Sequence, residues 1–218
     1  NLVPAPEANN SHNNDWCKSQ DMEQAKKLLD DAGWKVGADG VREKDGRKLS
    51  ILYQTSTNSV RQAAQALIKQ WWEELGAAVE LRKIDAAVYI GGDPGSPDTL
   101  EKFFADVEMY ANNFDGTDPE KYLGDWVCAE IPRPETQWQG GNVSRMCIEA
   151  YDQLQAKLGQ TADPAERSKI AIQLNDMIVD SGSFIALVHR GRVSAKSNAL
   201  GGGSSSRTPV GVWQLTRS

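Results

Sequence analysis

Histidine is scarce in this chain, which limits the nucleophilic chemistry that the sequence can support. Its two histidines are His12 and His189. A nucleophilic triad needs a serine or cysteine beside a histidine that a carboxylate orients. His189 follows the apolar residues 185–188, a setting typical of a structural histidine, and His12 lies in a polar leader. No G-x-S-x-G sequence occurs, so we predict no catalytic residue and no enzyme.

Metal and nucleotide sites have equally little support. The three cysteines, Cys17, Cys128 and Cys147, form no C-x-x-C pair, and the two histidines lie far apart in sequence, which is poor material for a metal centre. The glycine runs at 91–92 and 201–203 match neither the P-loop nor the dinucleotide-binding pattern. The sequence therefore predicts no metal site and no cofactor.

Aromatic, amide and charged side chains instead gather in segments that follow predicted strands. Flat aromatic rings supply contact area, while amides and ions orient a small polar ligand. An alternative stays open for Trp126 and Trp138, which could pack beneath a long loop. We predict a ligand site made of Tyr110, Asn112, Asn113, Phe114, Asp115, Trp138, Asn142 and Arg145.

Composition and charge narrow the class of protein further. The chain has 24 Lys and Arg against 30 Asp and Glu, with a net charge of −6, and its basic residues alternate with acids, so nucleic acid is not an expected partner. No apolar run approaches the roughly 18 residues that span a bilayer. The first 14 residues are polar and do not resemble a signal peptide. Together with the start at Asn1, this fits a mature or trimmed fragment.

The odd number of cysteines leaves two options, either one disulfide plus a thiol or three reduced thiols. We favour a Cys128–Cys147 disulfide, because it closes a segment rich in Pro, Gly and Asn whose chain entropy is otherwise costly. Such a bond would place the protein in an oxidising compartment.

The first half of the chain alternates helices and strands. A helix over residues 21–32 is predicted from its apolar spacing and from Asp21 and Gln24 as a capping box. Turns at 39–40 and 45–46 indicate a small hairpin around residues 41–43. Strands at 49–53 and 79–82 flank a long helix, and this order predicts a right-handed parallel crossover. Ser59 is the predicted cap of that helix, and its predicted buried face is Val60, Ala63, Ala64, Leu67, Ile68, Trp71 and Leu75.

The second half begins with a short helix through Phe104 and a strand over 107–111, followed by a helix that opens at Asp118-Pro119. An irregular loop is expected from Cys128 to Cys147. We further predict helices over 148–158 and from a cap at Asp163 to near Gly182, with Pro164 at the first position. The remaining predicted elements are a buried strand at 184–193, a flexible linker at 201–206 and a last segment at 210–215.

Several of these segments together resemble one family. They are the helix from Gln24 to Trp34, the hairpin 39–46, the helix 63–76, Asn142-Val143-Ser144-Arg145 with Tyr151-Asp152, and the segment from Asp163 to Asn175. Their order and spacing resemble the C-terminal lobe of the dipeptide/oligopeptide-binding family of extracellular solute-binding proteins, family 5. The fold class that follows is α/β, with a mixed β-sheet flanked by helices, as one lobe of a type II periplasmic-binding-protein-like fold.

The resemblance implies a two-lobed binding protein that closes about a hinge. Residues 1–18 would then be an interlobe connector, 19–199 the C-terminal ligand-binding lobe, and 200–218 a return segment toward an N-terminal lobe. Its role would be to deliver peptides or similar small solutes to an ABC permease from the periplasm. Family members carry an aspartate that pairs with a peptide ammonium, and here either Asp115 or the neighbouring Asn112 or Asn113 stands at that place. The alternatives are a hydrolase domain or a cell-surface interaction module.

Overall fold

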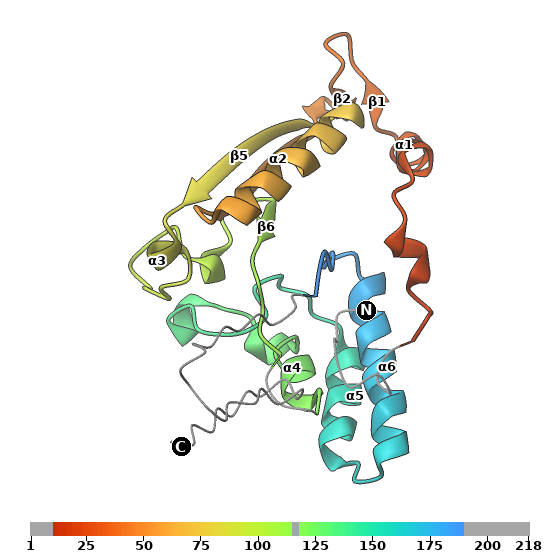
Figure 1. Cartoon of the computed structure of the whole chain (residues 1–218), viewed down its shortest axis with the longest axis vertical. Coiled ribbons are helices and arrows are strands. Elements are labelled where there is room, and N and C mark those ends of the chain that lie inside the picture. Colours follow the sequence, from red (N-terminus) through yellow and green to blue (C-terminus); the bar gives the residue numbers. More distant parts are fainter. Residues whose placement is uncertain (1–10, 115–117, 190–218) are drawn as a thin grey trace, which may run out of the picture. The chain divides into compact units, whose positions relative to one another are not determined.

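The computed structural model describes residues 11–114 and 118–189 (Figure 1). The chain divides into two compact units. One, here called the sheet unit, consists of Cys17–Asn112 and Pro132–Val143. The other, the helical unit, consists of the residues up to Trp16, of Asn113–Ile131 and of the chain from Ser144 on. The chain therefore enters the sheet unit twice.

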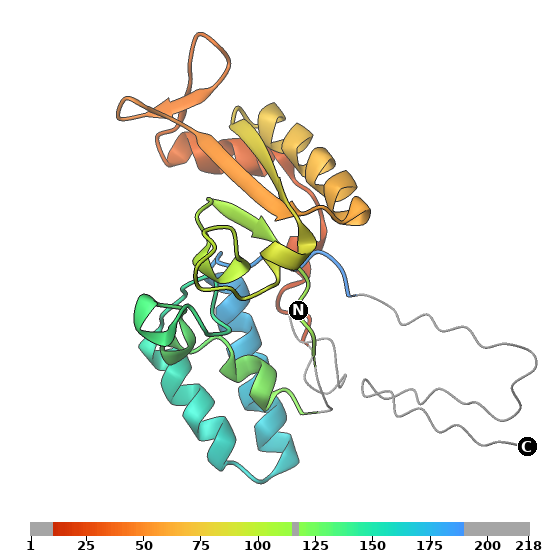
Figure 2. The same cartoon turned by 90° about the vertical axis from the view of Figure 1, so that its left-hand side faces the viewer.

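The main sheet of the sheet unit is parallel. Its strands are β4 (Ser50–Ser56), β5 (Ala78–Ile84) and β6 (Val107–Met109), in the order β5-β4-β6. Both outer strands run parallel to β4, with Ser50 opposite Ala78 and Tyr53 opposite Val107. The helix α2 (Ser59–Glu74) connects β4 to β5 and lies along the sheet (Figure 2). The predicted strand-helix-strand crossover is thus confirmed.

The core between α2 and the sheet is small and mostly apolar. Tyr53, Ala77, Val79 and Met109 are buried there, and the half-buried Trp72 of α2 packs against them. The rings of Tyr53 and Trp72 lie 5.1 Å apart between centroids. Burial of such rings helps to fix α2 on the sheet.

The predicted buried face of α2 is partly wrong. Val60, Leu67 and Trp71 are exposed, with 75%, 53% and 40% of their surface accessible, while Ile68 packs against the core and Gln65 is fully buried. Apolar residues occur in adjacent pairs along this helix, so two neighbouring faces fit the same spacing and periodicity alone could not choose between them. Its cap also differs by one residue, because Asn58, and not Ser59, accepts the hydrogen bond from Arg61 N–H.

A second, antiparallel sheet precedes β4. It contains β1 (Lys35–Val36), β2 (Arg42–Lys44) and β3 (Arg47–Lys48), so the predicted hairpin has a third strand. The helix α1 (Met22–Asp31) stands before it, with Asp21 accepting the predicted cap bond from Gln24 N–H at 2.8 Å. Arg42 is buried and links the two, because its guanidinium donates to Asp30 at 2.5 Å and to the Leu75 carbonyl at 2.6 Å.

Between β5 and β6 the chain forms only short helical turns, α3 (Ala86–Tyr89) and the 3₁₀ turn η3 (Leu100–Lys102). The predicted helix through Phe104 is therefore reduced to one turn. Phe103 has a φ of 47°, in the left-handed region, which ends any right-handed helix. The strand predicted to continue to residue 111 ends at Met109.

The helical unit is built from α4 (Glu120–Gly124), α5 (Glu149–Gln160) and α6 (Pro164–Asp180), with the 3₁₀ turn η4 (Cys128–Glu130). Two further 3₁₀ turns are η2 (Asp15–Lys18) and, in the sheet unit, η5 (Pro134–Thr136). The helices α5 and α6 lie side by side (Figure 1). As predicted, Asp163 caps α6 and Pro164 begins it. The core of this unit comprises Tyr122, Leu123, Trp126, Met146, Tyr151, Leu158, Ile170, Ala171, Leu174 and Ile178.

The buried strand predicted at 184–193 is not present in its described part. Residues 184–189 form no strand, and Ile185, Leu187 and Val188 are 72%, 56% and 76% exposed. Only Phe184 joins the core, with its ring 4.3 Å from that of Trp126. An apolar run indicates that its burial would be favourable. A strand also needs a neighbouring strand to pair with, and composition alone does not provide one. Residues 190–193, the linker 201–206 and the segment 210–215 lie outside the described residues.

In the described ranges, no helix combines the length and apolar character needed to cross a membrane.

Candidate ligand-binding site

The carboxyl edge of the parallel sheet is the expected location of a ligand site. In open α/β sheets, ligands bind outside the carboxyl ends of the strands. Here β4 ends at Ser56, β5 at Ile84 and β6 at Met109. The residues that follow, including Asn58, Asp85 and the predicted Tyr110, are therefore brought to one edge of the sheet unit.

Arg61 stands in the first turn of α2 at this edge. Its guanidinium donates a hydrogen bond of 2.9 Å to the hydroxyl of Ser56, the buried last residue of β4. Within the described part of the chain, Arg61 forms no ion pair. The helix N-terminus adds unsatisfied N–H groups and a partial positive charge. A half-buried, unpaired cation beside a helix N-terminus is suited to an anionic group such as a carboxylate.

Buried amides occur on the strand and the helix that meet at Ser56 and Arg61. Gln54 on β4 and Gln65 on α2 are 2% and 0% exposed. The Gln54 amide donates to Glu108 on β6, and the Gln65 amide donates to the Tyr53 carbonyl at 2.7 Å. The side-chain carbonyl oxygens of both glutamines are buried without a hydrogen-bond partner from the protein. Buried acceptors of this kind are costly unless water or a ligand satisfies them.

Tyr89 completes the group from α3. The side chain is fully buried, and its hydroxyl donates to the Met109 carbonyl at 3.4 Å. Burial raises the pKa of Tyr89 well above its usual range, Glu108 and Tyr110 raise it further, and Arg61 lowers it. The hydroxyl therefore remains protonated, and its one proton is donated to the Met109 carbonyl.

The predicted site residues are divided between the two units. In the sheet unit, Tyr110 is half-buried directly after β6, Asn112 is exposed, Trp138 is half-buried and Asn142 is fully buried. The helical unit contains the exposed Asn113, Phe114 with its ring 5.4 Å from Tyr122, and the half-buried Arg145. Asp115 lies outside the described residues.

Trp126 and Trp138, which could either contact a ligand or pack beneath a long loop, lie in different environments. Trp126 is 1% exposed in the core of the helical unit, so it is a packing residue. Trp138 contacts the ring of Phe104 edge-on at 6.1 Å, and the Lys102 ammonium lies 5.1 Å from its ring centroid. Trp138 therefore packs within the sheet unit, and its contact with a ligand stays a prediction.

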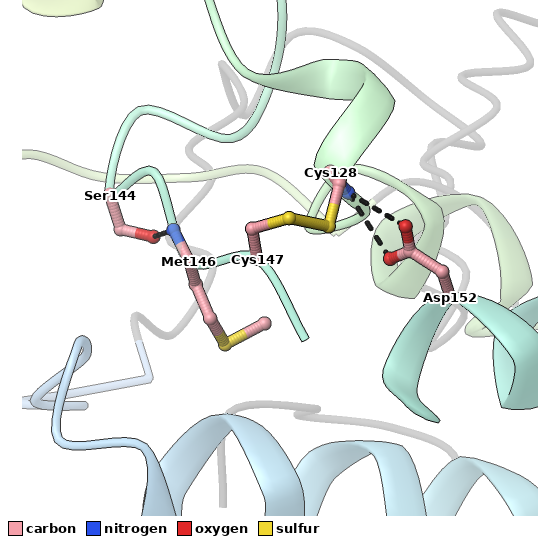
Figure 3. The surroundings of a disulfide bond; sticks show 5 residues. All are labelled: Cys128, Ser144, Met146, Cys147 and Asp152. Atoms are coloured by element: carbon pink, nitrogen blue, oxygen red, sulfur yellow. Dashed lines mark hydrogen bonds between the residues drawn. A yellow bond between two sulfur atoms is a disulfide. The ribbon is translucent and has the colours of Figure 1, made fainter. Parts of the chain in front are cut away.

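The predicted disulfide is confirmed. Cys128 and Cys147 are bonded in the helical unit, and Cys128 N–H donates to both carboxylate oxygens of Asp152, at 3.1 and 3.2 Å (Figure 3). Cys17 is exposed and has no part in the disulfide.

The polar group at the sheet edge was not found from the sequence. Taken one at a time, Arg61 is a charged residue on a helix, and Gln54 and Glu108 are polar residues on strands. The available signal was topological. The strand-helix-strand order already predicted a parallel crossover, and the first turn after such a strand lies at the carboxyl edge.

Comparison with known proteins decides the family. The family model described as bacterial extracellular solute-binding proteins, family 5 Middle, matches residues 2–130. The chain belongs to this family. Among curated relatives, the oligopeptide-binding protein OppA of Lactococcus lactis subsp. cremoris (strain SK11) is 40% identical over 67 residues, which are 29% of this chain and 11% of the relative.

Solved structures of similar fold include NikZ from Campylobacter jejuni in complex with Ni(L-His). The match has a TM-score of 0.63 and 18% identity, and it covers 77% of this chain and 33% of that one. The oligopeptide-binding protein from Thermus thermophilus, complexed with a pentapeptide, has a TM-score of 0.61 and 21% identity over 75% of this chain and 28% of its own. The expected family and α/β fold are confirmed. The chain spans about a third or less of these proteins.

Proposed function

We propose that this chain is one lobe of a solute-binding protein that captures peptides or similar small solutes and delivers them to an ABC permease. Membership of the family 5 extracellular solute-binding proteins supports a binding role and an extracellular or periplasmic location. The relatives include oligopeptide-binding proteins, which supports peptides as the ligand class. Residues 1–18 and 200–218 would connect to the N-terminal lobe of the same protein.

The observation that carries the proposal is Arg61 beside Ser56 at the carboxyl edge of the sheet. A peptide always offers one terminal carboxylate unless it is blocked. A guanidinium binds a carboxylate through two parallel hydrogen bonds, and the N-terminus of α2 stabilises the same charge. Arg61 would therefore hold the ligand carboxylate. The unsatisfied side-chain carbonyl oxygens of Gln54 and Gln65 would accept hydrogen bonds from water or from N–H groups of the ligand.

The predicted residues have complementary roles in this proposal. Within the sheet unit, Tyr110 and Trp138 would supply flat contact area, and Asn112 and Asn142 would provide polar groups. For Asn113, Asp115 and Arg145, contact with the ligand stays a prediction. Because the two lobes would share the ligand surface, the full-length protein should bind more tightly than this chain alone.

A peptide-binding experiment with a matched arginine control tests the proposal. Thermal shifts and calorimetry would compare full-length protein, Arg61→Ala and Arg47→Ala, since Arg47 is exposed on β3 away from the main sheet. For Arg61→Ala we expect a loss of about 10- to 100-fold in peptide affinity, as for the removal of a charged hydrogen bond. Arg47→Ala should bind normally.

Blocking the ligand carboxylate gives an independent check. A peptide amide should bind the wild-type protein weakly, and Arg61→Ala should no longer distinguish the amide from the acid. The anchor would be refuted if Arg61→Ala and Arg47→Ala bound the free peptide acid equally well. A protein that binds no peptide but hydrolyses a peptide or an ester would refute the transport role itself.

A further inference from the structure

The disulfide joins two points of the helical unit between which the chain visits the sheet unit. Cys128 and Cys147 are 19 positions apart in sequence, and their Cα atoms are 4.7 Å apart. Between them, Pro132–Val143 belongs to the sheet unit. We call these twelve residues the inserted segment. The disulfide therefore joins the point where the chain leaves the helical unit to the point where it returns, and so closes the loop that carries the inserted segment.

Side-chain contacts hold the inserted segment within the sheet unit. Trp138 packs edge-on against Phe104 and receives the Lys102 ammonium over its ring. Gln139 donates a long hydrogen bond of 3.5 Å to the Gly92 carbonyl. Asn142 and Val143, at the end of the segment, are buried. The path of the segment also depends on how its two ends are fixed.

The backbone between the cysteines adopts conformations that ordinary residues avoid. Gln137, Trp138 and Arg145 have φ values of 54°, 61° and 60°, and they are three of the five non-glycine residues with positive φ in the described part of the chain. Such conformations cost energy and persist only when the surroundings enforce them. A constraint at the base of the segment is one means of enforcement.

The two ends of the disulfide differ in accessibility. Cys128 is half-buried, and its N–H is bonded to Asp152 on α5. Cys147 is exposed, although its neighbour Met146 is buried in the core. Of the two cysteines, Cys147 is therefore the more open to a thiolate from solvent, while the backbone of Cys128 is bonded to α5.

We propose that Cys128–Cys147 is a thiol–disulfide exchange site whose reduction releases the inserted segment. The reductant is a dithiol, either a small molecule or a protein with paired cysteines. Its thiolate attacks Sγ of Cys147, the Cys128 sulfur leaves as a thiolate and takes a proton, and a mixed disulfide forms on Cys147. The second thiol of the reductant then attacks its own bonded sulfur, which frees Cys147 as a thiol and leaves the reductant oxidised. Two electrons pass to the protein.

Amide hydrogen exchange of the oxidised and reduced chain tests this proposal without any ligand. The Cys17→Ser variant restricts the redox chemistry to the disulfide, and the Cys128→Ser/Cys147→Ser variant reproduces the open loop without reductant. We expect exchange in the inserted segment to rise about tenfold or more in both open forms, because a local constraint is lost. Residues 170–178 of α6 should keep their protection.

Three outcomes would overturn the proposal. The first is unchanged exchange in the inserted segment after complete release of both thiols. The second is resistance of the disulfide to a dithiol under native conditions. The third is equal loss of protection in α6, which would make the bond a global staple. Trapping the mixed disulfide under limiting dithiol tests the direction of attack, since the reductant should be found on Cys147 and not on Cys128.

The exchange site also bears on binding, in a consequence that rests on the proposed function. Trp138 and Asn142 are carried on the inserted segment, so reduction should weaken peptide affinity of the full-length protein. Arg61 lies outside the segment, and the preference for a peptide acid over its amide should survive reduction. If the oxidised protein bound a peptide acid and its amide equally well, the carboxylate anchor would be refuted. The hydrogen-exchange result would still stand, because it is measured without a ligand.

Discussion

The side-chain amide of Asn14 donates a hydrogen bond of 2.7 Å to Asp176 on α6. Asn14 is buried, and Asn13 and Ser11 donate to the same carboxylate at 2.7 and 3.4 Å. The Asp176 carboxylate thus accepts hydrogen bonds from three side chains of residues 11–14. This segment is polar and has no apolar periodicity. The segment is held by hydrogen bonds, whereas most segments are held by apolar burial.

Replacing this carboxylate should release residues 11–14. For Asp176→Ala we expect increased proteolysis and hydrogen exchange before residue 15, because three donors lose their common acceptor, at a cost of roughly 1–3 kcal/mol in local stability. Asp180→Ala, an exposed carboxylate at the end of the same helix, is the control. Equal protection of the segment in both variants would show that other contacts hold it.

The rotation of α2 gives a sharp comparison between adjacent tryptophans. Trp72 packs on Tyr53 in the core, and Trp71 is 40% exposed. Trp72→Ala should lower the free energy of unfolding of the sheet unit by about 3 kcal/mol, whereas Trp71→Ala should lower it by about 1 kcal/mol or less. Urea unfolding followed by hydrogen exchange at β4 would measure both. A larger effect at Trp71 would mean that the sequence-based face is the buried one.

Removing the buried guanidinium of Arg42 should lower stability through lost hydrogen bonds. It is 4% exposed and joins α1, β2 and the end of α2 through Asp30, Trp34 and Leu75. Arg42→Met keeps the apolar stem but leaves two carbonyls and a carboxylate without their donor, which should cost about 2–4 kcal/mol in unfolding free energy. Arg47→Met, on the exposed β3, should be nearly neutral. A neutral Arg42→Met would indicate that water replaces the guanidinium.

The sequence predicted those features that depend on local pattern. Helix α6 follows from Asp163 and Pro164, and the parallel crossover follows from two apolar strands around a long helix. The family followed from ordered motifs. The disulfide was favoured because an entropically costly loop lay between its cysteines.

What the sequence did not predict depends on long-range partners. The apolar pairs on α2 leave its rotation undetermined until Gln65 bonds to the Tyr53 and Arg82 carbonyls. Residues 184–189 have the composition of a strand, but no strand forms there. At the sheet edge, Arg61 and Glu108 are 47 positions apart in sequence, and only the pairing of β4 with β6 brings their surroundings together.

Arg167 and Asp118 predict how acid affects the helical unit. Burial tends to raise the pKa of Asp118, but hydrogen bonds from Arg167 and from Glu120 N–H outweigh it and hold the pKa below the ordinary 3.8. A carboxyl whose pKa is lowered by folding contributes stability above its unfolded pKa and loses that contribution as the pH falls through the folded value.

Wild-type protein should therefore be more stable than Asp118→Asn at neutral pH, and the difference should shrink only as the pH falls below about 4. Urea midpoints measured from about pH 6 to about pH 2 on both proteins would show it. Glu166→Gln removes an exposed ion pair with Lys169 and is the matched control, expected to change the midpoint little at any pH. A difference for Asp118→Asn that stays constant down to the lowest pH would show that its carboxylate charge is not what stabilises the contact with Arg167.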